Sequence, residues 1–205
     1  WIYVDGPKPN ATEETLKKIE EVKKVVREKK WCKEVTIVEA VANKGLVKST
    51  IEGITKMVNE FGKVIAMEDD GLVSPGFLKY MNDALDFYEH NPRVMHISAY
   101  ARPDLAGAEV KESTYFFYHT TTWGWGTWKR AWDKFNPDAL TVKKAIAAKG
   151  NISKLNMDNT FEFFWGLKAV AKKQFSWNTI WHSVVFLNDG LCLYPKKSLV
   201  DNIGH

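Results

Sequence analysis

The chain has 205 residues, of which 45% are apolar and 26% charged, and its formal net charge is +4. This apolar share supports a buried core, so the composition excludes a disordered chain. The apolar stretches are far shorter than the ~20 residues of a membrane span, and the dense basic runs of a nucleic-acid binder are absent. Two cysteines, Cys32 and Cys192, are too few for a disulfide scaffold and favour a reducing, cytoplasmic compartment.

The first hundred residues alternate between short β-branched runs and amphipathic helical patterns. We expect strands at 1–4, 35–38, 64–67 and 94–97, and helices at 12–30, 46–61 and 74–90. Thr12 is the predicted N-cap of the first helix, and Ser74, followed by Pro75, that of the third. Repeated strand and helix units predict an α/β fold with a mostly parallel sheet flanked by helices. Because the chain opens directly on a strand, we also expect a first strand of the fold to be missing from it.

The alternation lapses after residue 98. There we expect a loop around Pro103 and Gly107, strands at 114–119 and 191–194, and helices near 126–134, 141–149 and 159–173. No internal repeat or low-complexity linker interrupts the sequence. We therefore expect one domain over residues 1–205, with a nucleotide-type half at 1–98 and a more irregular half at 99–205.

Three successive carboxylates, Glu68, Asp69 and Asp70, follow directly after the predicted strand 64–67. Open α/β sheets bind their ligands at the carboxyl ends of strands. Three like charges repel there, and a divalent cation relieves the repulsion; oxygen ligands suit Mg²⁺ or Mn²⁺, especially when substrate phosphates complete the shell. The alternative is a solvated acidic turn at which Asp70-Gly71 reverses the chain. We favour the metal site, because carboxylates beside a buried strand are costly unless something uses them.

Segment 64–70, with Ser74-Pro75 and Phe77-Leu78 after it, resembles the Asp-X-Asp motif of GT-A glycosyltransferases. The likeness is to the acidic triplet of N-acetylglucosaminyltransferase I and of bacterial family-2-like sugar transferases. The tryptophan block 123–128 and the ending 194–204 resemble later blocks of the bacterial group. The resemblance implies a Rossmann-like GT-A fold, with a nucleotide-binding half at 1–98 and an acceptor-binding half at 99–205.

The activity that the resemblance implies is metal-dependent, inverting transfer of a sugar to a glycan or a lipid-linked acceptor. The donor is a nucleotide-sugar, with a UDP-sugar as the default, and the cofactor is Mn²⁺ or Mg²⁺. The implied setting is polysaccharide biosynthesis in the cytoplasm, with peripheral association with the inner face of the membrane.

The resemblance also gives roles to matching residues. Asp70 coordinates the metal, Asp69 contacts the ribose or a metal-bound water, and Glu68 orients the donor. The nucleotide base and ribose are assigned to residues on the first two turns: Asp5, Gly6, Asn43 and Gly45. His205, directly after the Asn-Ile-Gly ending, is a further candidate metal ligand.

An inverting enzyme needs a base that takes the proton of the acceptor hydroxyl. The nearest match to the aspartate of the related animal enzyme is Asp158, just before the predicted helix 159–173. An ordinary helix N-cap explains Asp158 equally well. Glu162 and Asp133 are the reserve candidates.

Trp123 and Trp125 are separated by one glycine, and exposed indoles stack well on sugar rings. We expect one of the two to face the site and the other to lie in the core. The block continues into Lys129 and Arg130 rather than into acidic residues, so we assign no catalytic acid to it.

Two other functions compete with sugar transfer. One is a non-catalytic carbohydrate- or nucleotide-binding remnant of the same fold. The other is a metal-dependent nucleotidyltransferase, which normally requires a Gly-rich, Lys-bearing loop near its first strand. The sequence shows no such loop.

Overall fold

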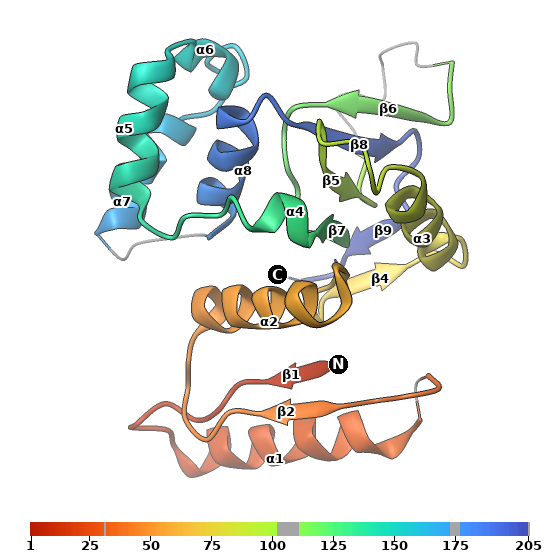
Figure 1. The fold of residues 1–205 in the computed structure, drawn as a ribbon. Helices are drawn as coiled ribbons and strands as arrows, with labels where there is room; N and C mark the ends of the chain where they lie inside the picture. Colours follow the sequence, from red (N-terminus) through yellow and green to blue (C-terminus); the bar gives the residue numbers. More distant parts are fainter. Residues whose placement is uncertain (31, 102–110, 173–176, 205) are drawn as a thin grey trace. The chain divides into compact units, whose positions relative to one another are not determined.

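The computed structural model describes residues 1–30, 32–101, 111–172 and 177–204 (Figure 1). The chain contains two compact units, Trp1–Gly53 and Ile54–His205. The expected single domain, with halves that meet at residues 98 and 99, stays a prediction. No helix within the described ranges is both long enough and apolar enough to cross a membrane.

The first unit is built on a two-stranded parallel sheet. β1 (Ile2–Val4) pairs with β2 (Ile37–Glu39), and α1 (Glu13–Glu28) connects them. Thr12 caps α1 as predicted, because its side-chain oxygen accepts a hydrogen bond from the backbone N–H of Thr15 at 3.2 Å. α2 (Leu46–Phe61) begins in this unit, at the predicted residue. Alternating strand and helix patterns therefore predicted this part of the chain correctly.

A five-stranded sheet forms the centre of the second unit, with the strand order β3-β7-β5-β8-β6. The strands are β3 (Lys63–Ala66), β5 (Val94–Ser98), β6 (Thr114–Phe117), β7 (Trp125–Trp128) and β8 (Leu191–Pro195). β5 and β8 are parallel, whereas the other three neighbouring pairs are antiparallel. The fold is a mixed α/β fold with helices around a mixed sheet, so the expectation of a mostly parallel sheet is wrong.

The position of β7 explains this difference. The sequence predicts a helix from about residue 126, but Trp125–Trp128 is a buried strand, and α4 (Lys129–Trp132) begins only after it. β7 lies between β3 and β5, so an antiparallel strand separates two strands expected to be parallel neighbours. Gly126 permits the close packing, because a Cβ there would lie 3.0 Å from the Val64 carbonyl oxygen.

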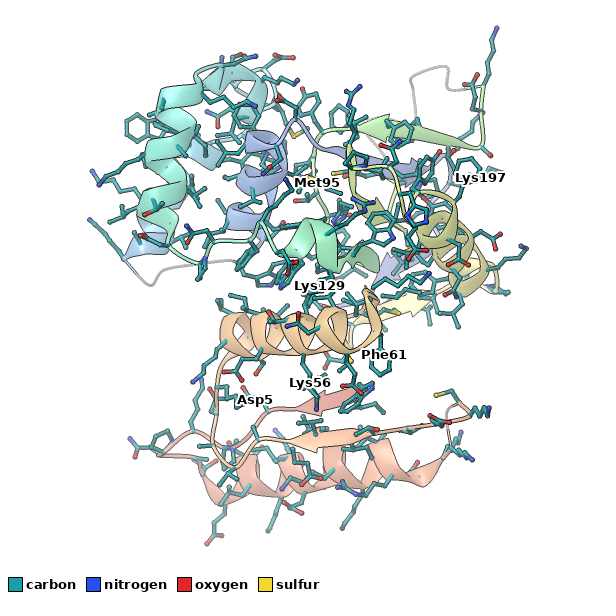
Figure 2. The ribbon with its side chains drawn as sticks, in the orientation of Figure 1. Asp5, Lys56, Phe61, Met95, Lys129 and Lys197 are labelled. Atoms are coloured by element: carbon teal, nitrogen blue, oxygen red, sulfur yellow. The ribbon has the colours of Figure 1, made fainter. Side chains whose placement is uncertain are left out.

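Helices pack on the sheet and on one another (Figure 1). α3 (Phe77–Phe87) joins the buried core through Phe77, Met81 and Leu85. A separate helical group contains α5 (Ala139–Lys149), α6 (Ile152–Leu155), α7 (Phe163–Ala171) and α8 (Trp177–Leu187). Met95 on β5, labelled in Figure 2, is fully buried within the second unit.

A small antiparallel sheet follows the three acidic residues. β4 (Gly71–Val73) starts directly after Asp70 and pairs with β9 (Val200–Asn202). Neither strand was predicted. The predicted helix start at Ser74 is also wrong, because α3 has Gly76 at its N-cap and the Ser74 N–H donates to the Leu199 carbonyl at 2.9 Å. Residues 199–204 thus lie alongside the acidic segment.

Candidate functional site

Glu68, Asp69 and Asp70 occupy the turn between β3 and β4, here called the acidic turn. The Gly71 N–H donates to the Glu68 carbonyl at 3.2 Å. Glu68 and Asp70 are partly buried, whereas Asp69 is exposed. Burial, together with the charges of Asp70 and Asp69, raises the pKa of Glu68. The crowding of like charges expected from the sequence is therefore present.

The chain encloses the carboxylate of Asp70 without satisfying it. Its Oδ1 is buried and accepts no hydrogen bond from any described residue. Gly204 lies directly against this carboxylate, since a Cβ at position 204 would overlap Oδ2 and lie 3.1 Å from Cγ. The Ile203 N–H donates to the Asp70 carbonyl at 2.9 Å, and the Gly204 N–H donates to Asn202 Oδ1 at 3.1 Å. These contacts hold the segment in place.

A buried carboxylate oxygen without a donor is costly unless a donor or cation joins it. Asp70 therefore fits the expected metal ligand, and carboxylate oxygens suit Mg²⁺ or Mn²⁺. Across the described ranges, no group of three or more His, Cys, Asp or Glu side chains is arranged to hold a metal ion. A cation at Asp70 would thus need oxygen ligands from substrate phosphates or water. His205, the other candidate ligand, lies outside the described residues.

A hollow of about 530 Å³ opens beside β4 and β9. Its lining includes Trp123, which is 37% exposed and meets the Tyr100 ring edge-on with centroids 4.7 Å apart. Ser74 also lines the hollow, and its Oγ is buried without a hydrogen-bond partner among the described residues. The hollow thus has an aromatic face suited to a sugar ring.

The two candidate stacking residues have different environments. Trp125 is 2% exposed and stacks on His96 and Trp177, with centroids 5.1 and 5.3 Å away. Gly124 allows the two indoles to differ in exposure, because its φ of 62° turns the chain between the exposed Trp123 and the buried Trp125. Trp125 is a core residue without a free face for a sugar, which corrects its candidate role; sugar stacking by Trp123 stays a prediction.

The candidate base lies in an unusual turn. Asp158 is exposed and has a φ of 56°, within a run of three left-handed residues, Met157–Asn159. The alternative that Asp158 caps the next helix is wrong, because α7 has Glu162 at its N-cap. Burial and the charge of Asp158 raise the pKa of Tyr118. Asp158 does not line the hollow beside β4 and β9, and its role as base stays a prediction.

The reserve bases are also outside that hollow. Glu162 is exposed at the start of α7 and makes no side-chain capping bond there. Asp133 follows α4 and forms an ion pair with Lys129 at 2.5 Å. Neither has a contact that favours it over Asp158.

In the first unit, the four residues assigned to the nucleotide base lie together around the Asp5 carboxylate. Oδ1 accepts hydrogen bonds from the N–H groups of Gly6 at 2.9 Å and Lys44 at 2.8 Å. Oδ2 accepts from the Gly45 N–H and from Asn43 Nδ2, both at 3.0 Å. Burial acts to raise the pKa of Asp5, but the backbone donors and the Lys44 charge outweigh it and lower the pKa.

A carboxylate has about four acceptor positions, so these bonds occupy Asp5. Asp5 fixes the loop 43–45 ahead of α2, a structural role that the sequence analysis missed. The signal was present, because an aspartate ends one strand and Asn43-Lys44-Gly45 precedes the next helix. Contact of Asp5 with a nucleotide base stays a prediction.

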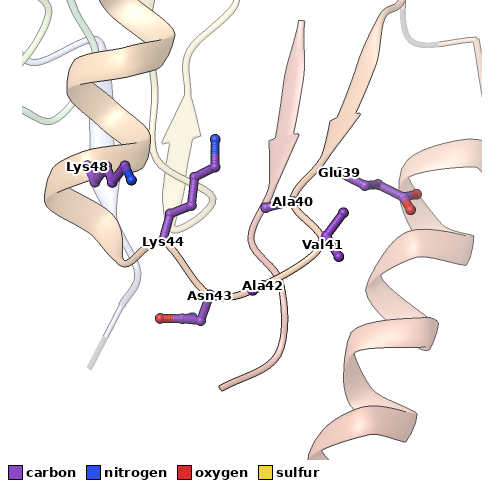
Figure 3. Close-up of a pocket in the computed structure, with 7 residues that line it drawn as sticks. All are labelled: Glu39, Ala40, Val41, Ala42, Asn43, Lys44 and Lys48. Atoms are coloured by element: carbon purple, nitrogen blue, oxygen red, sulfur yellow. The ribbon is translucent and has the colours of Figure 1, made fainter. Parts of the chain in front are cut away.

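A second hollow, of about 490 Å³, lies along residues 39–44 with Lys48 (Figure 3). Gly6 is buried under this loop, because a Cβ there would lie 2.6 Å from the Ala40 carbonyl oxygen. Lys44 extends beside the hollow and pairs with Glu52 at 2.7 Å. Asn43 thus lines this hollow, whereas Gly6 lies beneath the loop.

No protein-family model and no curated protein matches this chain. The resemblance to GT-A glycosyltransferases therefore stays a hypothesis.

Proposed function

We propose that the chain is a metal-dependent glycosyltransferase that transfers a sugar from a nucleotide-sugar to a glycan or lipid-linked acceptor. The observation that carries the proposal is the acidic turn at the end of β3, where the buried Oδ1 of Asp70 has no hydrogen-bond partner among the described residues. The neighbouring hollow with the exposed Trp123 indole supports it. So does the resemblance of segment 64–70 to the Asp-X-Asp motif, which also supports an inverting reaction and a UDP-sugar donor.

Sugar transfer leaves negative charge on the departing diphosphate, and Mn²⁺ or Mg²⁺ bound by Asp70 would stabilise that charge. Asp69 is exposed and free to reach a ribose hydroxyl or a water. Glu68, partly buried, orients the donor through hydrogen bonds to its hydroxyl groups. Trp123 offers an apolar face to a sugar ring. Asp158 is the proposed base for the acceptor hydroxyl.

Calorimetric titration with UDP-, GDP- and dTDP-sugars, with and without Mn²⁺, tests the proposal. We expect one nucleotide to bind more tightly with Mn²⁺, and Asp70→Asn to remove that difference. Asparagine has nearly the same shape and eases the repulsion in the acidic turn, so the variant should fold. A melting curve on the same sample checks this.

Unchanged Mn²⁺-dependent affinity in Asp70→Asn would refute Asp70 as the metal ligand. Binding without sugar transfer to any glycan or lipid-linked acceptor would support the non-catalytic remnant. Release of diphosphate from a nucleoside triphosphate in the presence of a sugar phosphate would support a nucleotidyltransferase.

A further inference from the structure

α7 exposes an aromatic side chain at the edge of the helical group. Trp165 is 59% exposed. Lys168 and Lys172 follow it at spacings of three and seven residues and are exposed too, so the three lie on one face of the helix. Leu167, fully buried, points to the opposite side. Figure 1 shows α5 and α7 remote from β4 and β9 within the second unit, so this face is separate from the acidic turn.

A lysine on α5 extends over the same rings. Lys143 Nζ lies 4.4 Å from the centroid of Phe164 and 4.6 Å from that of Trp165. Burial and the nearby charge of Lys168 lower the pKa of Lys143. The ammonium group of Lys143 therefore lies beside an aromatic surface and close to the positive charge of Lys168. An anionic partner would relieve the repulsion between these two lysines.

The lysines around Trp165 lack acidic partners. Within the described residues, Lys143, Lys168 and Lys172 form no ion pair within 4.0 Å, whereas Lys149 pairs with Asp189 at 2.8 Å. Residues 139–172 contain six lysines and only two acidic residues, Asp158 and Glu162. The net charge of this segment is therefore +4.

We propose that the Trp165 face, consisting of Trp165, Lys143, Lys168 and Lys172, docks the protein peripherally onto an anionic lipid surface. An indole enters the headgroup region of a bilayer, while lysines keep their ammonium groups at the phosphates. Segment 139–172 contains no arginine, the residue that best makes bidentate phosphate contacts, which argues against a nucleic acid. This inference does not rest on the proposed sugar transfer, because it uses no residue of the acidic turn.

Co-sedimentation with lipid vesicles tests the proposal. The full chain is mixed with vesicles of phosphatidylcholine alone or with roughly one third phosphatidylglycerol, at low and high salt. We expect binding to the anionic vesicles only, weakened by salt. Lys168→Glu with Lys172→Glu should lower the partition coefficient roughly tenfold or more, since each lysine near an anionic surface contributes about fivefold. Trp165→Ala should lower it severalfold without changing the charge.

Lys17→Glu with Lys24→Glu is the matched control. Both lysines are exposed on α1, and the double variant changes the net charge equally. Equal losses in the two double variants would reveal a general charge effect and overturn the assignment. Failure to bind anionic vesicles at low salt would overturn it as well, as would retention on heparin without vesicle binding, which would indicate a polyanion. The lysine substitutions lie on the surface, so the test does not depend on Trp165→Ala folding.

Discussion

Gly204 allows the C-terminal segment to approach the Asp70 carboxylate, and any larger residue would displace one of them. We predict that Gly204→Ala displaces the Asp70 carboxylate and lowers Mn²⁺-dependent nucleotide affinity roughly tenfold. Such a change corresponds to a loss of only about 1.4 kcal/mol of binding free energy. Gly76→Ala is the control, since a Cβ there meets nothing within 4 Å. Calorimetric titration of both variants makes the comparison. Native affinity in Gly204→Ala would show that the close approach has no role in binding.

Trp123 and Trp125 differ in burial. Substitution of Trp125 should therefore mainly affect stability, and substitution of Trp123 should mainly affect sugar binding. Trp125→Ala should reduce the free energy of unfolding by about 3–5 kcal/mol, as expected for a large buried ring. Trp123→Ala should reduce it by less than about 1 kcal/mol, because the ring is partly exposed. The same variant should weaken sugar binding by about 1 kcal/mol through lost stacking.

Urea unfolding and sugar titration measure the two effects separately. A large loss of stability in Trp123→Ala with no loss of binding would make Trp123 a core residue instead.

At the scale of elements, the loop that precedes α2 is held by Asp5. We predict that Asp5→Ala destabilises the first unit by about 1–2 kcal/mol, because the donors of Gly6, Lys44 and Gly45 lose their acceptor. The N–H groups of Lys44 and Gly45 then lose their acceptor, and their hydrogen exchange should accelerate.

Asp138→Ala serves as the control, because Asp138 caps α5 in the second unit through the Leu140 N–H. This variant should leave exchange at Lys44 and Gly45 unchanged. Native exchange rates in Asp5→Ala would contradict the role of Asp5 in holding the loop 43–45.

The elements that the sequence predicted well are those with local signals. α1 has a threonine cap and two acidic residues in its first turn, and α2 has a continuous apolar stripe. β4 and β9 have three residues each, too few for any periodicity, and their existence depends on pairing with each other. β7 is a strand because it pairs on both sides, although its sequence, Trp-Gly-Thr-Trp, contains a glycine.

The candidate site also has one part that could be predicted from the sequence and one part that could not. The place of the acidic turn after a buried strand could be predicted, because strand and carboxylates are adjacent in the sequence. Its enclosure by residues 202–204 could not, because that contact joins distant parts of the chain. The occupation of Asp5 by the loop 43–45 also joins separate segments, although turn residues on both sides indicated it.

At the scale of the whole molecule, two buried histidines link stability to pH. His96 accepts a hydrogen bond at Nδ1 from Trp181 Nε1 at 3.1 Å, and His182 Nε2 lies 3.0 Å from the Leu155 carbonyl oxygen. Burial lowers the pKa of His96 to about 3 and that of His182 to about 4. Both are neutral in the folded protein at physiological pH.

In the unfolded chain both histidines titrate near the ordinary pKa of about 6.5, so below that pH the unfolded state binds more protons. The contribution of the two histidines to the free energy of unfolding is therefore fully present above pH of about 6.5. It decreases as the pH falls from there towards their folded-state pKa values. We predict a loss of roughly 2 kcal/mol between pH 6 and pH 5, measured by urea unfolding.

His90→Gln should show the same slope, since His90 is exposed. Equal stability at the two pH values would mean that the two buried rings are accessible to protons in the native state.

The pairing of β4 with β9 affects when, during synthesis, the native site around Asp70 can form. Residues 71–73 leave the ribosome long before their partners, residues 200–202. Until then Asp70 lacks the segment that encloses it, and closing so long a loop is entropically costly and slow. A ligand that needs the native position of Asp70 is thus bound only by a chain synthesised past Gly204, however early the five-stranded sheet begins to form. Nascent chains stalled before residue 200 should fail to retain such a ligand.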